Sequence, residues 1–338
     1  MKSKIIRVVG IVVGVLALGI AVFLIVASQR AADRLAQHFE AHALDLPVPN
    51  PLTEAELAAL RAERGGADGD AGVDPLAGLD LAALAQERAL ERGKHLVEAR
   101  YACAQCHGLN FGGGTMIDDP AIGHLLGPNL TGGKGSVTKD YTFADWDRIV
   151  RHGIKSDGTP AVMPSEDFFA MSDHELSDIV AYIRSLPPVD HEVPKPALGP
   201  VGKVLVMVGK FPLSAEVLTD HSRAHAAFAP EASDSPEFGK HLAAICSGCH
   251  RANFAGGKMQ FGPPSWPAAA NLTQHQDGLG GWTFEEFEKV LTEGVSKSGK
   301  PLQAPMSDVI AATRAMKPLE RKALWTYLTT LSPVPTNR

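Results

Sequence analysis

The sequence has few aromatic residues, few cysteines and no long stretch of one charge. Of its 338 residues only 6% are Phe, Trp or Tyr, whereas glycines number 33 and prolines 24. Few aromatics among many turn residues agree with domains whose core is completed by a large cofactor. The net charge is −6 and no Lys/Arg run is sustained, so the basic face of a nucleic-acid-binding protein is missing and we expect no nucleic-acid partner. No segment alternates apolar and polar residues for long, which argues against a strand-rich fold.

The four cysteines are arranged as two Cys-x-x-Cys-His motifs. This motif is the attachment signature of c-type haem. Two thiols on one helical turn can reach the two vinyl groups of a porphyrin, while the histidine faces the iron. We therefore predict two covalently bound haem c groups. The predicted attachment residues are Cys103, Cys106, Cys246 and Cys249, and the predicted proximal iron ligands are His107 and His250.

Other uses of paired cysteines have to be weighed. Cysteines of exported proteins usually form disulfides, a Cys-x-x-Cys pair can be a redox dithiol, and Cys/His sets can bind zinc. A thioredoxin-like dithiol belongs to a fold that alternates strands and helices, a pattern that this chain lacks. A zinc site needs four ligands at suitable spacings. Two copies of the full motif inside a repeated unit favour haem.

The first thirty residues predict a membrane anchor. Lys2, Lys4 and Arg7 precede an uncharged apolar run from Val8 to Ala27. A helix of about 20 residues spans about 30 Å, the thickness of the hydrocarbon core, and positive residues stay cytoplasmic. We therefore expect residues 1–30 to be a single-pass anchor in the cytoplasmic membrane, with the haem domains facing the periplasm or cell exterior. The alternative is a cleaved signal peptide, whose apolar core would be shorter.

Changes in composition divide the rest of the chain. We expect a membrane-proximal spacer and linker over residues 31–85, a first domain over 86–190, a connector over 191–230 and a second domain over 231–338. The expected fold class is all-α: two tandem cytochrome c-like haem domains behind an N-terminal transmembrane helix. Apolar spacing predicts helices at 84–99, 142–152, 172–186, 236–244, 283–293 and 317–331.

The spacer is expected to contain helix and linker. Residues 31–43 can extend the anchor helix until a proline-rich segment stops it. A short helix from Thr53 to Arg64 would begin with a capping box between Thr53 and Glu56. Residues 65–75 have the composition of a flexible linker.

The second domain repeats the first in the order of its motifs, which indicates a duplication. The equivalent positions include Gly93 and Gly239, His95 and His241, Phe111 and Phe254, Asn129 and Asn271, Thr142 and Thr283, Gly153 and Gly294, and Tyr182 and Tyr327.

A methionine sulfur is the expected second axial ligand of each iron. Met116 and Met259 closely follow their motifs and would have to pass round the haem edge at once. Met163 and Met306 lie just before the last helix of each domain, at the same separation from their motif histidines. The intervening chain can therefore wrap the haem and deliver the ligand from the far side. We predict Met163 and Met306 as the distal ligands; the third methionine of each domain is Met171 or Met316.

At these residues the chain resembles the class I cytochrome c family in two tandem copies. In that family the proline carbonyl of a Gly-Pro-Asn-Leu stretch accepts a hydrogen bond from the proximal histidine. Residues 127–130 match this stretch, so the resemblance implies that Pro128 orients the first histidine. The second domain has Ala269-Ala270-Asn271-Leu272 instead. The Ala270 carbonyl would serve its histidine without the stiff proline, and we expect a softer proximal side and a different potential.

The family's distal Met-Pro dipeptide matches Met163-Pro164, whereas Met306 follows Pro305. The whole arrangement resembles membrane-bound cytochrome c subunits of periplasmic dehydrogenases, which often carry three haems. It implies an electron carrier, not an enzyme, that passes single electrons between a periplasmic donor and a respiratory-chain acceptor. The redox protein partners are not identified by the sequence.

Two other functions stay open. A dihaem peroxidase would need one haem that can open a coordination position, and equivalent methionines in both halves argue against it. A haem-based gas sensor would need an iron that binds CO or NO.

Several other polar residues could take part. His95 and His241 are expected on helix surfaces. The connector contains three histidines that could bind a metal ion, but we do not expect them to do so: His191, His221 and His225. Three residues of the first domain are considered as partners of the haem propionates: Trp146, Arg148 and Arg151.

Overall fold

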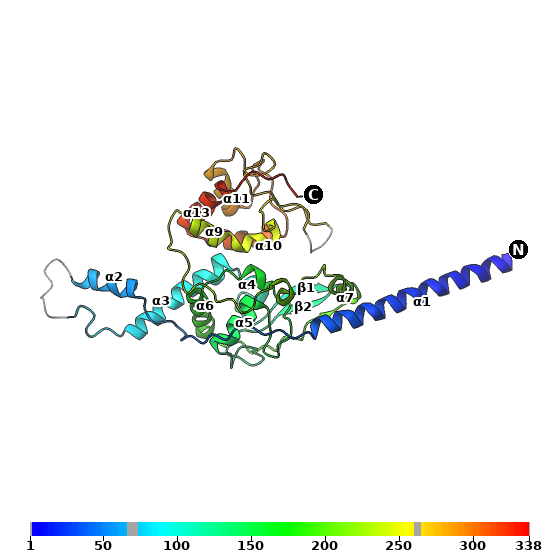
Figure 1. The fold of residues 1–338 in the computed structure, drawn as a ribbon, viewed down its shortest axis with the longest axis horizontal. Coiled ribbons are helices and arrows are strands. Elements are labelled where there is room, and N and C mark those ends of the chain that lie inside the picture. The colour runs from blue at the N-terminus through cyan, green and yellow to red at the C-terminus, as the bar shows by residue number, and fades with distance from the viewer. Residues whose placement is uncertain (1, 66–73, 260–264, 338) are drawn as a thin grey trace.

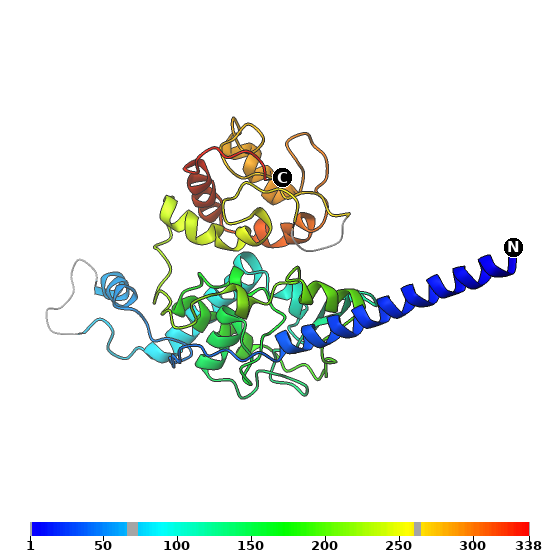
Figure 2. The same cartoon turned by 45° about the vertical axis from the view of Figure 1, so that its right-hand side comes forward.

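The computed structural model describes residues 2–65, 74–259 and 265–337. A long N-terminal helix, α1 (Lys2–Leu35), projects from two helical bodies, one formed by each half of the repeat (Figure 1). Turning the molecule shows the second body lying against the first, and α1 extending away from both (Figure 2). The expectation of a mostly helical chain is confirmed.

The exposed helix α1 carries the apolar run of the sequence. Its segment Ser3–Leu35 is the one helix of the described chain that is long and apolar enough to cross a membrane. The C-terminal part of α1 packs on α7 (Pro200–Met207), as Figure 1 also shows. Arg34 then pairs with Glu216 of α8 (Ser214–Val217), with 3.0 Å between Nε and Oε1. The base of the anchor is therefore held by the connector.

The expected continuation of this helix to residue 43 is wrong, because α1 ends at Leu35. Tertiary hydrogen bonds replace helical ones beyond that point. The Phe39 amide donates to the Gly158 carbonyl at 2.9 Å, and the His42 amide donates to the His221 carbonyl at 2.9 Å. The spacer therefore runs along the first domain before any proline is reached.

The short spacer helix is confirmed as α2 (Glu54–Gly65). Its capping box has the expected partners: the Thr53 amide donates to Glu56 Oε2 at 2.8 Å, and the Glu56 amide donates to Thr53 Oγ1 at 3.1 Å. Most of the linker predicted over 65–75 lies outside the described residues.

Each predicted helix of the first domain is present, with ends set by local capping. Thr142 and Asp145 form a reciprocal capping box at the start of α5, and Gly153 ends that helix in the left-handed conformation, with a φ of 67°. The elements of this domain are α3 (Leu81–His95), the π-helical turn η1 (Leu96–Arg100), α4 (Ala104–His107), α5 (Phe143–His152), the 3₁₀ turn η2 (Ser165–Asp167) and α6 (Asp173–Ser185).

The second domain repeats this order and adds one helix that the sequence did not predict. The addition is α12 (Met306–Ala315), which stands where the first domain has only η2. The other elements are α9 (Pro236–Ala243), the 3₁₀ turn η3 (Ala244–Cys246), α10 (Ser247–His250), α11 (Phe284–Glu293) and α13 (Pro318–Thr329).

A glycine at the crossing of the first and last helices holds each domain together. A Cβ on Gly93 of α3 would lie 2.1 Å from the Asp178 carbonyl oxygen of α6. A Cβ on Gly239 of α9 would lie 2.0 Å from the Ala323 carbonyl oxygen of α13. The backbones of the crossing helices therefore touch, and only glycine permits this distance.

Three short strands were not predicted. β1 (Gly114–Asp119) pairs antiparallel with β2 (Gly123–Gly127), and β3 (Ala197–Leu198) of the connector adds to β2. The strands have at most six residues, which is too short for a clear alternating pattern in the sequence. In the second domain the corresponding contact, within the part of this loop that the structure describes, is an isolated bridge between Gly257 and Ala269.

We predict that Gly93→Ala destabilises the first domain by about 1–3 kcal/mol or more, because the added methyl group must separate α3 from α6. Thermal unfolding of the haem-loaded chain measures this. Gly132→Ala is the matched control, since its Cβ meets nothing within 4 Å. Equal melting temperatures for the two variants would contradict the tight crossing.

Candidate haem attachment sites

Each Cys-x-x-Cys-His motif forms a single helical turn. In the first motif the His107 amide donates to the Cys103 carbonyl at 3.0 Å, and α4 covers the residues between them. The second motif runs through the end of η3 and α10. All four cysteines are half-buried, and none of them forms a disulfide. This one-turn arrangement suits thioether attachment of a porphyrin.

A backbone carbonyl orients each motif histidine. His107 Nδ1 donates to the Pro128 carbonyl at 3.0 Å, and His250 Nδ1 donates to the Ala270 carbonyl at 2.7 Å. Burial lowers the pKa of both rings, and these hydrogen bonds offset the effect only in part. The rings are therefore neutral, with Nε2 free to bind a metal.

The loop that carries Pro128 packs directly on the first motif. β2 ends at Gly127, where a Cβ would lie 2.0 Å from the Cys106 carbonyl oxygen. The β1–β2 hairpin thus brings the Pro128 carbonyl to the histidine. Asn129 is fully buried and fixes the next turn, because its Nδ2 donates to the Val189 carbonyl at 2.7 Å.

Neither alternative use of the cysteine pairs fits the structure. A redox dithiol needs a thiol with a lowered pKa, but burial raises the pKa of Cys103 and of Cys246 to about 12. Within the described ranges, neither motif belongs to a group of three or more Cys, His, Asp or Glu ligand atoms that could share one metal ion. Covalent haem attachment is the remaining function, and it uses both cysteines and the histidine of each motif.

Five of the six methionines considered as axial ligands show how different their environments are. Met171 and Met316 lie in the two hydrophobic cores, only 2% and 8% exposed, and Met116 is 36% exposed on β1. Met163 lies half-buried before η2, where its carbonyl accepts a hydrogen bond from the Ser165 amide at 2.8 Å. Met306 begins α12 at the edge of the second core. Axial ligation by Met163 and Met306 stays a prediction.

Two buried polar atoms of α5, Trp146 Nε1 and Arg148 Nε, have no hydrogen-bond partner among the described residues. The Nη2 atom of Arg148 does pair with Asp145 Oδ1, at 2.5 Å. Buried N–H groups are rarely left without an acceptor, so these donors fit an anionic group such as a haem propionate. Arg151 does not share this role, because its guanidinium is fully buried against Asp147 and Asp173, at 2.6 and 2.8 Å.

The two motifs meet the distal segments of the opposite domain. Gln105 of the first motif donates from Nε2 to the Asp308 carbonyl at 2.7 Å, just after Met306. The equivalent residue of the second motif is Gly248, and a Cβ there would lie 2.4 Å from Asp167 Oδ1, just after Met163. Each attachment loop therefore contacts the segment that carries the other domain's predicted distal methionine.

An ion network that the sequence did not predict joins the domains. Arg100 donates from Nη1 to Glu175 and from Nε to Glu320, each at 2.8 Å. His241 contacts Glu175, and His95 contacts Glu320, each at 2.9 Å. The expectation that these histidines lie on helix surfaces is wrong, because both lie in the interface. The sequence did contain a signal for this interface, because the two histidines occupy equivalent positions of the repeat and so do the two glutamates.

The sequence model of the cytochrome c family matches the chain twice, over residues 90–187 and 237–332. The chain belongs to the cytochrome c family. It has two cytochrome c domains, each with a complete motif for haem c, and so two haem c groups.

The cytochrome resembles subunits of dehydrogenases. It is 26% identical to the fructose dehydrogenase cytochrome subunit of Gluconobacter japonicus, over 73% of this chain and 53% of that protein. It is 27% identical to the gluconate 2-dehydrogenase cytochrome c subunit of Pantoea cypripedii, over 64% of this chain and 54% of that protein. The cytochrome c subunit of a quinone-type alcohol dehydrogenase from Gluconacetobacter polyoxogenes is 28% identical, over 69% and 54%. The chain spans about half the length of these relatives, and none of the three supports a peroxidase.

The interdomain network makes a pH-dependent prediction. Burial raises the pKa of Glu175 and of Glu320, but hydrogen bonds and positive charge from the histidines and Arg100 outweigh burial and lower both pKa values to about 2. A glutamate of an unfolded chain titrates near pH 4.3, at about its usual pKa. The stabilisation is therefore fully present above about pH 4.3 and is lost as the pH falls towards 2.

We expect Glu320→Gln to destabilise the cytochrome by roughly 3–5 kcal/mol at neutral pH, because it removes one partner of a buried pair. Calorimetry of wild type and variant should show this difference shrinking as the medium is acidified below about pH 4. Glu286→Gln is the control, because Glu286 also caps a helix but is exposed to solvent. A difference that did not change with pH would rule out the charge network as its source.

Proposed function

We propose that this cytochrome is an electron carrier that is anchored in the cytoplasmic membrane and passes single electrons from a periplasmic dehydrogenase to an acceptor of the respiratory chain. The observation that carries the proposal is the domain interface. Both attachment loops lie there, each against the distal segment of the other domain, through Gln105 with Asp308 and Gly248 with Asp167. Such an arrangement supports electron exchange within one chain.

The proposed roles follow the repeat. Cys103 and Cys106, and Cys246 and Cys249, form the thioethers. When bound, each haem supplies a one-electron Fe(III)/Fe(II) couple. The Nε2 atoms of the proximal histidines and the sulfurs of the distal methionines would hold each iron, which would leave no open position for a substrate. The proposed axial pairs are His107 with Met163 and His250 with Met306.

The partners and the orientation are inferred from chemistry and from the relatives. The relatives are named as cytochrome subunits of fructose, gluconate and alcohol dehydrogenases, which points to a dehydrogenase as donor. The basic residues before the apolar run of α1 favour a cytoplasmic N-terminus. The haem domains then lie on the periplasmic side, where small-molecule dehydrogenases and quinone or oxidase acceptors meet.

The two haem sites differ, which suits a directed transfer. The first site has Pro128 after a hairpin, whereas at the second the described residues before Ala270 form one isolated bridge. The first also has the unpaired donors of Trp146 and Arg148. A more rigid proximal side and a cation near the propionates both change the reduction potential. We therefore propose two different potentials.

Replacement of the distal methionines tests the ligand assignment. Met163→Ala and Met306→Ala should each lower the potential of one of two one-electron waves in a redox titration followed by visible spectroscopy, because loss of the thioether ligand favours Fe(III). Met171→Leu and Met316→Leu are the matched controls, because these methionines lie in the cores and should leave both waves unchanged. A normal pair of waves in both alanine variants would refute the assignment.

Two further measurements on the wild-type protein distinguish an electron carrier from a peroxidase and from a gas sensor. The closed sites predict no appreciable peroxide turnover by the half-reduced wild type and no CO binding by the reduced protein. Robust turnover would favour the peroxidase, and CO binding would favour the sensor.

Arg148→Gln tests the difference between the sites. It removes a cation that would face the propionates, so it should lower the potential of one wave and leave the other unchanged. Lys289→Gln, at the equivalent position of α11, is the control, because Lys289 is exposed and pairs with Glu293 at 3.7 Å. An equal response to both variants would exclude a specific role for Arg148.

A further inference from the structure

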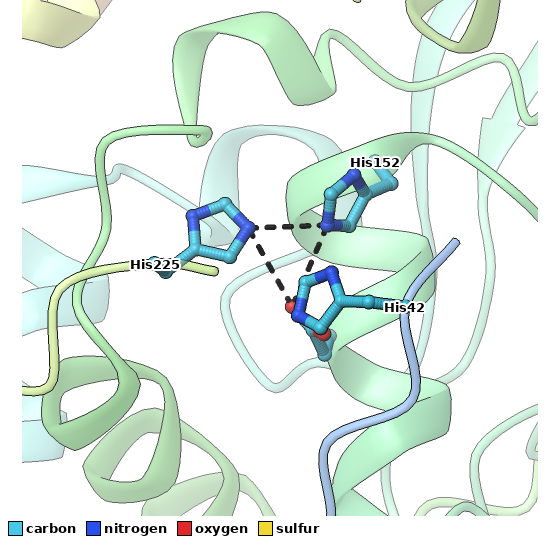
Figure 3. A group of neighbouring side chains, drawn as sticks. His42, His152 and His225 are labelled. Carbon is cyan, nitrogen blue, oxygen red and sulfur yellow. Dashed lines mark hydrogen bonds and ion pairs between the residues drawn. The ribbon is translucent and has the colours of Figure 1, made fainter. Parts of the chain in front are cut away.

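A cluster of histidines lies outside the two haem motifs, where three separate parts of the chain meet. His42 comes from the spacer, Asp147 and His152 come from α5, and His225 comes from the connector. One potential ligand atom from each of these four residues lies within 4.8 Å of the others. Figure 3 shows the rings of His42, His152 and His225, which come from different parts of the chain and lie around one point.

Backbone carbonyls set the tautomers of two of the rings. His225 Nδ1 lies 2.9 Å from the Phe169 carbonyl oxygen, and His42 Nδ1 lies 3.2 Å from the His221 carbonyl oxygen. A carbonyl can only accept a hydrogen bond, so both Nδ1 atoms carry the proton. The Nε2 atoms of His225 and His42 therefore present lone pairs to the centre of the cluster.

A chain of hydrogen bonds sets the third tautomer in the same way. His221 Nε2 donates to the Ala215 carbonyl at 2.9 Å, which leaves His221 Nδ1 as an acceptor. His152 Nδ1 lies 3.2 Å from that atom and is therefore the donor. His152 Nε2 also presents a lone pair to the centre.

This arrangement brings two lone pairs into contact. The Nε2 atoms of His152 and His225 are only 3.1 Å apart. With both protons on Nδ1, no hydrogen bond can join them, and only a cation between them makes the distance favourable.

The carboxylate of Asp147 also has an oxygen without a hydrogen-bond partner. Its Oδ1 accepts a hydrogen bond from Arg151 Nε at 2.6 Å, whereas its fully buried Oδ2 has no hydrogen-bond partner among the described residues. His42 Nε2 is unpartnered as well and lies 3.3 Å from this oxygen. A buried polar atom without a partner is unfavourable, and one cation would satisfy both atoms.

We propose that His42, His152, His225 and Asp147 form a structural Zn²⁺ site. Four ligand atoms at tetrahedral zinc lie about 3.3 Å apart, given bond lengths of about 2.0–2.2 Å. The Nε2 atoms of His152 and His225 are 3.1 Å apart, and His42 Nε2 lies 3.3 Å from Asp147 Oδ2. One ligand atom from each of the four residues lies within 4.8 Å of the other three. Three imidazoles and one carboxylate match zinc and not the all-oxygen sites of Mg²⁺ or Ca²⁺. Four protein ligands leave no open position, as in structural sites.

The surroundings already contain the groups that support such a site. The carbonyls of Phe169 and His221, and the ring of His221, hold the outer nitrogens of the three histidines. Asp173 pairs with Arg151 at 2.8 Å and compensates its charge beside the bound cation.

The site is not part of the repeated haem unit. The second domain has Glu288 and Glu293 where the first has Asp147 and His152. Glu288 instead pairs with Arg321 at 3.0 Å. The other two ligands lie in the spacer and connector, outside the family-matched ranges. The role of the metal is therefore to fasten the segment that follows the anchor to the first haem domain and the connector.

Metal analysis of the full chain, loaded with both haems and purified in detergent without a histidine tag, tests the proposal. We expect one zinc ion for every two haem irons by mass spectrometry. X-ray absorption at the zinc edge should show three imidazoles and one carboxylate oxygen at about 2.0–2.2 Å. Removal of the metal with a chelator should lower the melting temperature, and Zn²⁺ alone should restore it.

Single substitutions locate the site. His42→Gln and His225→Gln should each weaken Zn²⁺ binding by at least about tenfold, while both irons are retained. His38→Gln is the matched control, because His38 is exposed and close to His42 in the same segment. Retention of zinc by both variants would overturn the proposal, as would a wild type that contains no zinc and binds none at micromolar Zn²⁺. If a variant loses iron and so fails to fold, the zinc-edge spectrum of the wild type decides: fewer than three imidazoles would refute the site.

Discussion

The rest of the structure depends on the contact between the helix that precedes each motif and the last helix of the same domain. Gly93 and Gly239 let the two backbones touch. Beside each contact a tyrosine of the last helix packs edge-on against a phenylalanine just after the motif, with ring centroids 6.4 Å apart in the first domain and 5.9 Å in the second. The attachment turn therefore begins from a helix whose position is fixed, and haem attachment needs that fixed geometry.

Much of this architecture could be predicted from the sequence, because its signals are local. The two motifs, the capping boxes at Thr53 and Thr142, and the helices that follow them depend on residues a few positions apart. Because the two domains are repeats, each prediction for one domain could be applied to the equivalent residues of the other. The carbonyl partners of the proximal histidines, Pro128 and Ala270, followed from the resemblance and are present as hydrogen bonds.

What could not be predicted depends on contacts between distant segments. The β1–β2 hairpin and α12 carry no strong local pattern, and the early end of α1 is decided by hydrogen bonds to residues more than a hundred positions away. The same holds for the cluster around Asp147, since its ligands come from the spacer, α5 and the connector. A list of histidines cannot show which of them converge.

The domain interface combines ion pairs with apolar contacts, and in both kinds of contact each domain contributes a residue to the other. Ala99 of the first domain is buried in the second core, and Ile245 packs against the first. Both residues come from the segment just before a haem motif, and His95 and His241 are repeat-equivalent, so each domain gives the other the same kind of contact. The duplication thus produced a two-fold-like pair whose surfaces match, while the sites behind them have diverged.

The spacer has a consequence for how the cytochrome meets other proteins. Between α1 and the first domain the chain is bound at Arg34, Phe39, His42 and Asn50, so it does not act as a flexible tether. With α1 in a bilayer, the haem domains keep one height and one tilt above the lipid surface and move only by drifting and turning within the membrane plane. The haem domains are therefore held in a fixed position relative to the anchor helix and do not move on a flexible linker. A partner must bring its own redox centre to that height, and its shape, more than the reach of this chain, decides whether electrons pass.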